Sequence, residues 1–376
     1  MRSISVAPLA AAALAMAGVS GGTAFAAEDT RISGPHVHAN LAVYFVHGTS
    51  AGGPVPLTLQ EALTKGHVQV IETGRVNELQ IENTGSEQVF IQAGDIVKGG
   101  KQDRVLTVSF MLPANSGRLP IASFCVEQGR WAARGKEDQA KFSSAGEAMP
   151  SRSALLAMAA PPSEARPEAT RPAGDRPESA RPEASNSAAM QRITREQDET
   201  SKKQREVWDS VASTQKKLSR GLNAPVASPQ SASSLQLALE NEKLKDARTA
   251  YIGALQAAGE QGADVVGYVV AINGKMSAGN LYPSNGLFRK MWGKQLAAVV
   301  TEAIGKNQGA APTAAPPPPP APAAATEFLA DAEKGKTYER AVAAGARQEV
   351  RDADKSLYNE ARGADGKWIH RSYLAK

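Results

Sequence analysis

Cysteine is almost absent from this 376-residue chain, which contains only Cys125 and therefore forms no intramolecular disulfide. Aromatic residues make up only 5% of the chain. Beyond Val19, no apolar run approaches the roughly 18 residues that a membrane-spanning helix needs. The net charge of +5 is small and spread along the chain, so it does not indicate a nucleic-acid partner. These absences exclude a disulfide scaffold, a membrane anchor and a nucleic-acid-binding surface, and they leave an ordinary hydrophobic core to stabilise the fold.

Residues 1–26 have the pattern of a cleavable export signal. Arg2 supplies the positive charge, an alanine- and leucine-rich stretch runs over 6–19, and Ala24-Phe25-Ala26 gives the small-x-small pattern that a signal peptidase cleaves. The apolar stretch is too short to remain as an anchor. The alternative, a buried alanine-rich helix, is disfavoured because charged residues follow at once. We therefore expect a periplasmic or secreted protein that begins near Ala27 after cleavage.

Two segments have the composition of linkers. Residues 150–190 contain a repeat in which arginine and proline recur every fifth residue, at Arg166, Arg171, Arg176 and Arg181. Residues 309–325 contain five consecutive prolines at 316–320. Such sequences lack the large apolar groups needed for a packed core, so both are predicted to be disordered or extended spacers. A proline-rich partner motif is the alternative for either segment.

The linkers leave three segments, 31–149, 191–308 and 326–376, with separate strand and helix patterns. The last segment is predicted to hold a short helix and two strands, and Asn273-Gly274 is typical of a two-residue hairpin turn. This mixture predicts an α+β fold with a mixed or antiparallel sheet and flanking helices. Strand patterns occur at 41–46, 68–72, 78–82, 89–91, 105–112, 121–126, 265–272 and 368–374, and helical patterns occur at 57–63, 191–220, 235–255 and after Ser284.

Seven short motifs follow one another between residues 40 and 370. They are Asn40-Leu41-Ala42, Leu59-Gln60-Glu61-Ala62, Gly94 to Arg104, Cys125 to Trp131, Gly267 to Gly274, Phe288 to Trp292, and Ile369-His370. In this order they resemble a bacterial family, the ARG and rhodanese-phosphatase-superfamily-associated protein domain. Because the motifs run through all three segments, the resemblance implies one α+β domain interrupted by two inserts. The family has no established activity, so the resemblance implies no reaction.

The motif from Gly94 to Arg104 crowds Lys101, Gln102 and Arg104 onto a glycine-rich turn between two strands. Glycines allow backbone amides to approach a ligand closely, and Arg104 is suited to clamp a carboxylate or phosphate. The turn is not a Walker phosphate loop, since the Gly-Lys-Ser/Thr ending is missing. The alternative is a structural turn in which Arg104 pairs with a buried carboxylate such as Glu127.

Cys125, Glu127, Arg130 and Trp131 form a second candidate cluster. A nucleophilic cysteine needs a histidine or a cation beside it, and only His370 could arrive through the fold. Packing in the core is the favoured interpretation of Cys125, and Glu127 is the other weak catalytic candidate. Arg130 and Trp131 are suited to form a stacked platform for a ligand, or Trp131 simply caps the core.

His36 and His38 would share one face of a strand, and His47 follows. A metal site would need a third ligand such as His67 or His370, so we interpret these histidines as surface residues. The sequence therefore predicts neither a metal nor a cofactor.

We predict one ligand-binding surface, for a small polar or anionic ligand or a peptide of the cell envelope. Two alternatives stay open: a hydrolase in which Glu127 acts as acid or base and Arg104 or Arg130 stabilises charge, and a non-enzymatic interaction scaffold. A ligand site requires both arginines to point into a cavity, whereas a scaffold requires both to be used in internal ion pairs and no pocket to remain. The predicted surface is lined by Lys101, Gln102, Arg104, Glu127, Arg130 and Trp131.

Overall fold

The structure, a computed structural model, describes residues 31–135, 138–161, 181–307 and 317–376, and within 181–193 only the backbone. The predicted export signal at 1–26 and most of the arginine–proline repeat lie outside these residues. No helix among the described residues is long and apolar enough to cross a membrane.

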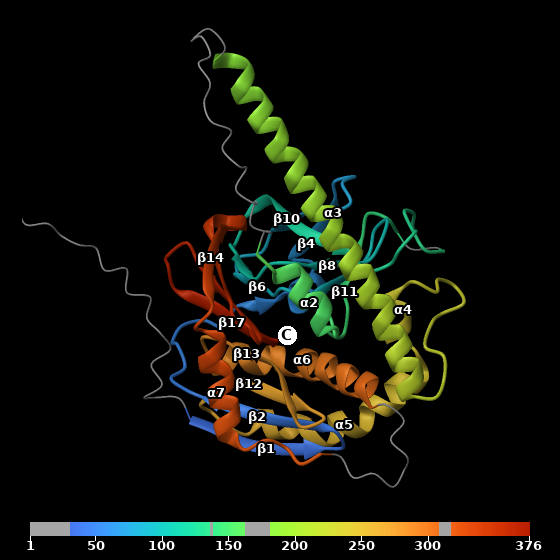
Figure 1. Cartoon of the computed structure of the whole chain (residues 1–376), viewed down its shortest axis with the longest axis vertical. Helices are drawn as coiled ribbons and strands as arrows, with labels where there is room; N and C mark the ends of the chain where they lie inside the picture. The colour runs from blue at the N-terminus through green and yellow to red at the C-terminus, as the bar shows by residue number, and fades with distance from the viewer. Residues whose placement is uncertain (1–30, 136–137, 162–180, 308–316) are drawn as a thin grey trace, which may run out of the picture.

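An eight-stranded antiparallel sheet is the largest element of the fold, and strands from all three predicted segments share it (Figure 1). The predicted segments are therefore parts of one α+β fold. The order is β1 (Arg31–His38), β2 (Leu41–His47), β12 (Val265–Ile272), β13 (Lys275–Leu281), β17 (Trp368–Ala375), β16 (Ser356–Arg362), β15 (Arg347–Asp352) and β14 (Lys336–Ala341).

Two smaller sheets form the other half of the molecule. In the three-stranded sheet, β3 runs parallel to β6, and β6 pairs antiparallel with β9. The six-stranded sheet has the order β11 (Phe142–Ser144), β7 (Ile96–Gly99), β8 (Arg104–Leu106), β10 (Gly117–Cys125), β5 (Glu78–Asn83) and β4 (Val68–Glu72), and the three-stranded sheet has the order β3 (Leu57–Thr58), β6 (Val89–Ile91) and β9 (Phe110–Leu112).

Seven helices among the described residues surround and separate these sheets. Thr58 caps α1 in a capping box, since its side chain accepts from the backbone of Glu61 while the Glu61 carboxylate accepts from the backbone of Thr58. Ser284 caps α6 as predicted, because its side chain accepts from the backbone N–H of Leu287. The helices are α1 (Leu59–Thr64), α2 (Arg152–Ala159), α3 (Arg181–Gly221), α4 (Leu235–Leu239), α5 (Glu242–Glu260), α6 (Asn285–Lys306) and α7 (Pro322–Ala332), with a 3-10 turn at Ala343–Gly345.

The strand predictions are strongest for the centre of the eight-stranded sheet. β2 and β12 are wholly or almost wholly buried, in agreement with their continuous apolar runs. The turn between β12 and β13 has positive φ at both Asn273 (51°) and Gly274 (72°), which is the geometry of the predicted hairpin.

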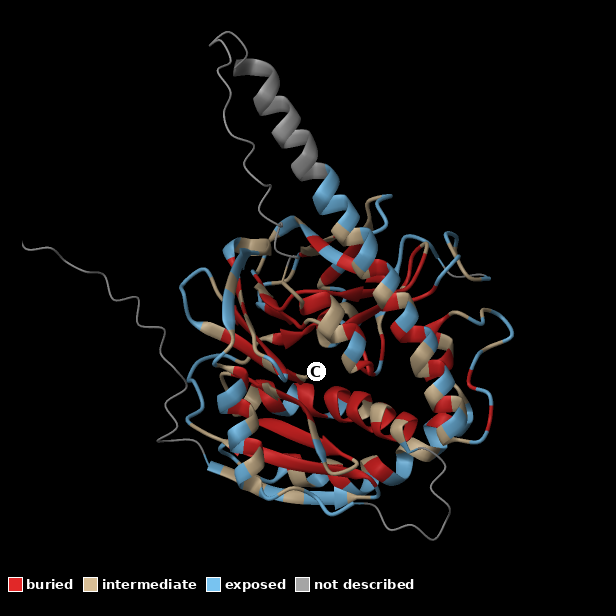
Figure 2. Ribbon diagram, in the orientation of Figure 1, coloured by how far each residue is buried: buried red, intermediate tan, exposed pale blue. Residues whose placement is uncertain are grey.

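α6 lies between the eight-stranded sheet and the other half of the molecule, and most of its buried apolar residues belong to the main core (Figure 2). Phe288 and Trp292 of α6 stack with ring centroids 5.8 Å apart, and Phe45 of β2 meets Trp292 edge-on at 5.3 Å. The same core contains Phe90 from β6 and Leu374 from β17. One continuous core therefore joins the two halves.

Several predicted boundaries are wrong. The strand predicted at 105–112 is two strands, β8 and β9, which belong to different sheets. The helix predicted at 235–255 is broken into α4 and α5, because the Asn241 side chain accepts from the backbone N–H of Lys243 and starts a new helix. The last segment holds four strands instead of two. β14 was missed because nearly all its residues are exposed and show no apolar alternation.

Both predicted linkers contain ordered structure at their edges. α2 lies inside the segment predicted as a spacer, and it buries Ala154 and Met158 although its composition is that of an alanine-rich linker. α3 begins at Arg181, and α7 begins at Pro322, also inside the predicted spacers. Pro320 is held in place because its carbonyl accepts a hydrogen bond from the Tyr44 hydroxyl.

Candidate functional site

The glycine-rich turn between β7 and β8 places Gln102 and Arg104 at one end of the six-stranded sheet. Gly99 and Gly100 both have positive φ, 126° and 61°. A Cβ atom on Gly99 would lie 2.3 Å from the carbonyl oxygen of Lys141. The glycines therefore allow the turn to pack closely against β11 of the same chain, and close approach to a ligand is not needed to explain them.

Arg104 is fully buried and is held by groups of the protein itself. Its Nη1 donates to the carbonyl oxygen of Gln102 at 2.8 Å, and its Nη2 lies 3.8 Å from a carboxylate oxygen of Glu72. The acidic partner of Arg104 is thus Glu72 and not Glu127. Trp131, which is 40% exposed, covers this group: its ring lies 5.2 Å from the Arg104 guanidinium and 5.4 Å from the Lys101 ammonium.

Glu127 and Asp103 are fully buried carboxylates that share two arginines. Glu127 accepts from Arg130 Nε at 2.6 Å and from Arg134 Nη2 at 2.8 Å. Asp103 accepts from the same Arg134 nitrogen at 2.7 Å and lies 3.4 Å from Arg130 Nη2. The Gln102 side-chain amide donates to the backbone carbonyl of Glu127. Each charge in this cluster therefore has an internal partner of opposite sign.

The predicted site residues thus lie together, but Gln102, Arg104 and Glu127 are buried. Burial by itself would raise the pKa of Glu127. A hydrogen bond from Ser231 and the neighbouring Arg130 and Arg134 outweigh that effect and hold this pKa below its ordinary value. An ionised carboxylate of this kind is a poor proton donor at neutral pH.

Cys125 is buried at the end of β10, and its thiol lies 3.7 Å from the carbonyl oxygen of Val76. Burial raises the pKa of the thiol to about 11, although the positive charge of Arg104 partly opposes this. His370 does not approach it, because the His370 ring contacts Ser109 and Asn280 instead. Cys125 is therefore protonated at neutral pH, as expected of a packed core residue.

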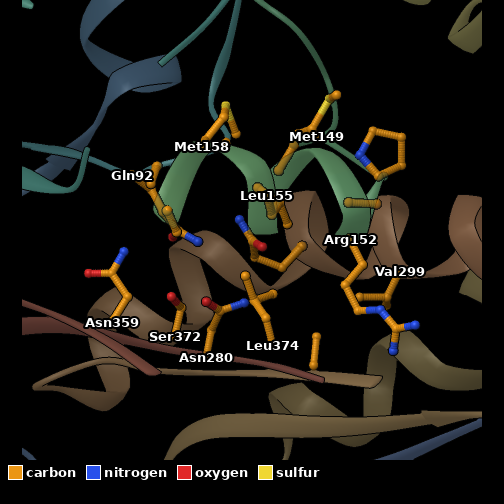
Figure 3. A pocket seen from close by; sticks show the side chains of 18 of the residues that line it. Gln92, Met149, Arg152, Leu155, Met158, Asn280, Val299, Asn359, Ser372 and Leu374 are labelled. Carbon is orange, nitrogen blue, oxygen red and sulfur yellow. The ribbon is translucent and has the colours of Figure 1, made fainter. Parts of the chain in front are cut away.

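A cavity of about 60 Å³ lies between the two halves of the molecule, beneath α2. Leu155 and Met158 of α2 form the apolar side, and Asn280 and Ser372 of the large sheet face them (Figure 3). This volume has room for roughly four or five water-sized groups. Other polar residues that line the cavity are Gln92, Thr107, Tyr268, Gln295 and Asn359.

A chain of hydrogen bonds fixes how Gln295 faces this cavity. Because the Asn280 side-chain oxygen only accepts, His370 Nε2 carries the proton, and its Nδ1 accepts from the Ser109 hydroxyl; both distances are 3.0 Å. Burial lowers the pKa of His370 to about 3, which keeps the ring neutral. Asn280 then donates to the Tyr268 hydroxyl at 2.7 Å, and Tyr268 donates to the Gln295 oxygen at 3.2 Å.

The Gln295 amide nitrogen, at the end of this chain, is buried and has no hydrogen-bond partner among the described residues. The side-chain oxygens of Gln92 and Asn359 are also occupied by protein donors. The Gln92 oxygen accepts from Tyr282 at 2.9 Å, and the Asn359 oxygen accepts from Gln348 at 2.7 Å. In all three amides the oxygen is occupied by the protein, so the nitrogen remains as the group that can donate into the cavity.

A second cavity of about 200 Å³ adjoins the first and is basic. The two share Pro150, Arg152 and Glu302 in their walls. The walls of the second cavity carry four basic side chains and one acidic side chain. Lys306 lies 2.7 Å from the acidic one, Glu302, and Lys376 lies 2.6 Å from Asp352. The four cations are Arg152, Lys217, Lys306 and Lys376. We call the smaller cavity the inner chamber and the larger one the vestibule.

A buried ion pair supports the inner chamber. Lys294 of α6 donates to Asp95 at 2.6 Å and to the Ser144 hydroxyl at 3.0 Å. The other oxygen of Asp95 accepts from the backbone N–H of Gln92 at 3.0 Å. Asp95 therefore fixes the backbone of a cavity residue and also ties α6 to the β6–β7 loop.

No group of three or more His, Cys, Asp or Glu side chains among the described residues is placed to hold a metal ion. The ring of His36 packs against Phe45, with centroids 5.4 Å apart, and the ring of His38 packs edge-on against Tyr251 at 4.7 Å. These two histidines therefore pack against aromatic rings at the surface end of β1.

Sequence reasoning missed the residues that line the inner chamber. Gln92, Asn280 and Asn359 come from three distant parts of the chain, and no motif spacing links them. The available signal was weak: each is an uncharged polar residue at or beside a mostly buried strand, in β13 and β16 and just after β6.

The chain matches the family model of the ARG and Rhodanese-Phosphatase-superfamily-associated Protein domain over residues 29–374. It therefore belongs to this family, as the motifs indicated. Neither a curated protein nor a solved structure matches the chain significantly.

Proposed function

We propose that this protein binds a small anionic ligand rich in hydrogen-bond acceptors, with one end in the inner chamber and its charge in the vestibule. The observation that carries the proposal is the unpartnered amide nitrogen of Gln295. A buried donor without a partner costs about 1–3 kcal/mol, and a ligand oxygen at that point would recover this cost.

The inner chamber favours oxygen acceptors over donors. Gln92, Gln295 and Asn359 each offer an N–H group, since their oxygens already accept from protein groups. A carboxylate, carbonyl or phosphate oxygen satisfies such donors, whereas an ammonium or amide N–H does not. A mostly apolar wall with a few convergent polar groups is typical of small-molecule binding sites.

The vestibule supplies the preference for negative charge. Arg152 lies in the walls of both chambers, and Lys217 and Lys306 line the larger one. Glu302 offsets only one of these charges. An anionic group beside Arg152 would therefore form charge-assisted hydrogen bonds, which are stronger than those between neutral groups.

A thermal-unfolding screen with matched ligands tests this site. Succinate and inorganic phosphate are compared with succinamide, which has the size of succinate without its charge. A ligand at a hundred times its dissociation constant adds about 2.7 kcal/mol, which raises Tm by several degrees. We expect a shift with an anion and a smaller one or none with succinamide.

Variants in each chamber identify the place of binding. Gln295→Leu removes the free donor, and Arg152→Met removes the shared cation. Lys243→Met, which removes an exposed lysine of α5, is the control for charge alone. We expect the ligand shift to vanish in the first two variants and to persist in the third. An unchanged shift in folded Gln295→Leu protein would contradict the proposal.

Export to the cell envelope is also part of the proposal, and the pattern of residues 1–26 supports it. Fractionation of expressing cells with N-terminal sequencing tests it, and we expect a mature chain that starts at Ala27. An intact N-terminus at Met1 in the cytoplasmic fraction would contradict export.

A further inference from the structure

Ser33, His47 and Asp264 form a hydrogen-bonded series at one end of the large sheet. The Ser33 hydroxyl oxygen lies 2.7 Å from His47 Nε2. On the other side of the ring, His47 Nδ1 lies 2.8 Å from a carboxylate oxygen of Asp264. A hydroxyl, an imidazole and a carboxylate in this order and at these distances have the geometry of a nucleophile, a base and an orienting group.

Three adjacent strands hold these residues together. Arg31 of β1 is paired with His47 of β2, and His47 is paired with Val265 of β12. Ser33 lies two residues from Arg31, so its side chain is a diagonal neighbour of His47 on the same face. Asp264 immediately precedes Val265. The backbone of the sheet therefore fixes the relative positions of all three groups.

Ser33 is partly exposed and lies at the edge of the large sheet. β1 is the edge strand of the sheet, and its pairing with β2 is interrupted by a bulge between Ser33 and His36. Bulges are frequent beside active sites because they redirect a side chain. The outer side of β1 has no neighbouring strand. The side chain of His47 is 11% exposed and that of Asp264 is 56% exposed.

We propose that Ser33, His47 and Asp264 form an acyl-transfer site that hydrolyses short carboxylic esters. The Ser33 oxygen attacks the ester carbonyl carbon while its proton moves to His47 Nε2. The ester C–O bond breaks, and the alcohol leaves with that proton. Water then attacks the acyl-Ser33 carbonyl and gives a proton to His47, which returns it to Ser33 as the carboxylic acid departs. Ester and water thus become acid and alcohol.

Arg31 contacts both His47 and Asp264, and its hydrogen bonds differ between the two neutral tautomers of His47. Its Nη2 lies 3.3 Å from Asp264 Oδ2 and 2.9 Å from His47 Nδ1. When Nδ1 carries the proton, it donates to Asp264, Arg31 donates to the other carboxylate oxygen, and Nε2 is free to accept from Ser33. When Nδ1 lacks the proton, Arg31 donates to it and Nε2 cannot act as a base. Catalysis by Ser33 requires the first tautomer.

A covalent probe gives the first test. The protein is treated with diisopropyl fluorophosphate and the labelled peptide is located by mass spectrometry. We expect one added dialkylphosphoryl group on Ser33, none in Ser33→Ala, and at least a 100-fold slower reaction in His47→Gln. Ser143→Ala, at an exposed serine of β11, is the matched control and should label like the wild type. Absence of label on wild-type Ser33, or equal labelling in His47→Gln, overturns the proposal.

Hydrolysis of p-nitrophenyl acetate gives the second test. Loss of a triad member typically costs about 10³-fold or more in rate. We expect that loss in kcat for Ser33→Ala and Asp264→Asn, with Tm values close to that of the wild type. We expect Arg31→Gln to increase the rate, because it removes the guanidinium that stabilises the inactive tautomer by donating to His47 Nδ1. A folded Ser33→Ala variant as active as the wild type refutes the site.

A third test uses a thiol variant, so that its result does not depend on which ester the protein hydrolyses. Ser33→Cys places a thiol beside the same imidazole, which should activate it toward iodoacetamide at pH 6. We expect at least a 100-fold faster reaction than in the double variant Ser33→Cys/His47→Gln. Equal rates in the two variants would show that His47 does not act as a base at this position.

Discussion

Replacing Asp95 by asparagine leaves the buried ammonium group of Lys294 without its carboxylate. Asp95 is 1% exposed and Lys294 is 8% exposed, and the two groups are 2.6 Å apart. Asparagine has nearly the same shape as aspartate, so packing around it is conserved and the main loss is the charge. Removal of one partner from a buried pair costs about 3–5 kcal/mol. The single side-chain oxygen of asparagine replaces two carboxylate oxygens, one of which accepts from Lys294 and the other from the backbone N–H of Gln92.

The assay is thermal unfolding by near-ultraviolet circular dichroism at a fixed scan rate. A loss of this size corresponds to a fall in Tm of roughly 6–15 °C. The double variant Asp95→Asn/Lys294→Met has no unpaired charge, and we expect it to be more stable than Asp95→Asn alone. A Tm of Asp95→Asn within about two degrees of the wild-type Tm, which is roughly the precision of such scans, would refute the inference that this pair stabilises the junction. A further fall in Tm on adding Lys294→Met would refute it as well.

Three further predictions concern the buried charge cluster and its neighbour. At pH 8, Cys125 should react with an aromatic disulfide reagent at least about 100-fold more slowly in the native protein than in guanidinium chloride. The reason is that the thiol is buried and burial raises its pKa to about 11. A fast reaction in the native protein would show that this part of β10 opens readily. The lowered pKa of Glu127 stabilises the fold above the ordinary value of 4.5, and this contribution is lost as pH falls through the lower folded-state pKa. Wild-type Tm should therefore fall more steeply below pH 4.5 than that of Glu127→Gln, and parallel curves would refute this. Arg104→Ala should lower Tm by several degrees, because it leaves the Glu72 carboxylate without its cation. It should not change the rise in Tm that an anion causes. Loss of that rise in a folded variant would show that the ligand binds at Arg104.

The sequence predicts elements whose signals are local. The hairpin at Asn273-Gly274 and the cap at Ser284 are each specified within a few residues, and both are confirmed. β2 is also confirmed, because a continuous apolar run needs burial on both faces. The sequence also predicted that two motifs meet in the fold. One motif contains Gln102 and Arg104, and the other contains Glu127 and Arg130.

Features that depend on distant partners were not predictable from one sequence. Glu72 and Arg134 complete the charge cluster, but nothing in their own surroundings marks them as partners of Arg104 and Glu127. α2 has the composition of a spacer and is identified only by what it covers. The inner chamber depends on the register of β13, β16 and β17, which local patterns do not determine.

The position of β17 has a consequence for how the protein reaches its folded state. This strand is the last in the sequence, yet it lies between β13 and β16 inside the sheet and pairs with both. The outer group β14–β16 therefore has no sheet to join until residues 368–375 have been synthesised. Pairing over such sequence separations makes folding slow, and earlier segments must wait with unpaired edges. A chain shortened by its last strand should therefore not lose one edge but divide the sheet into two unconnected pieces.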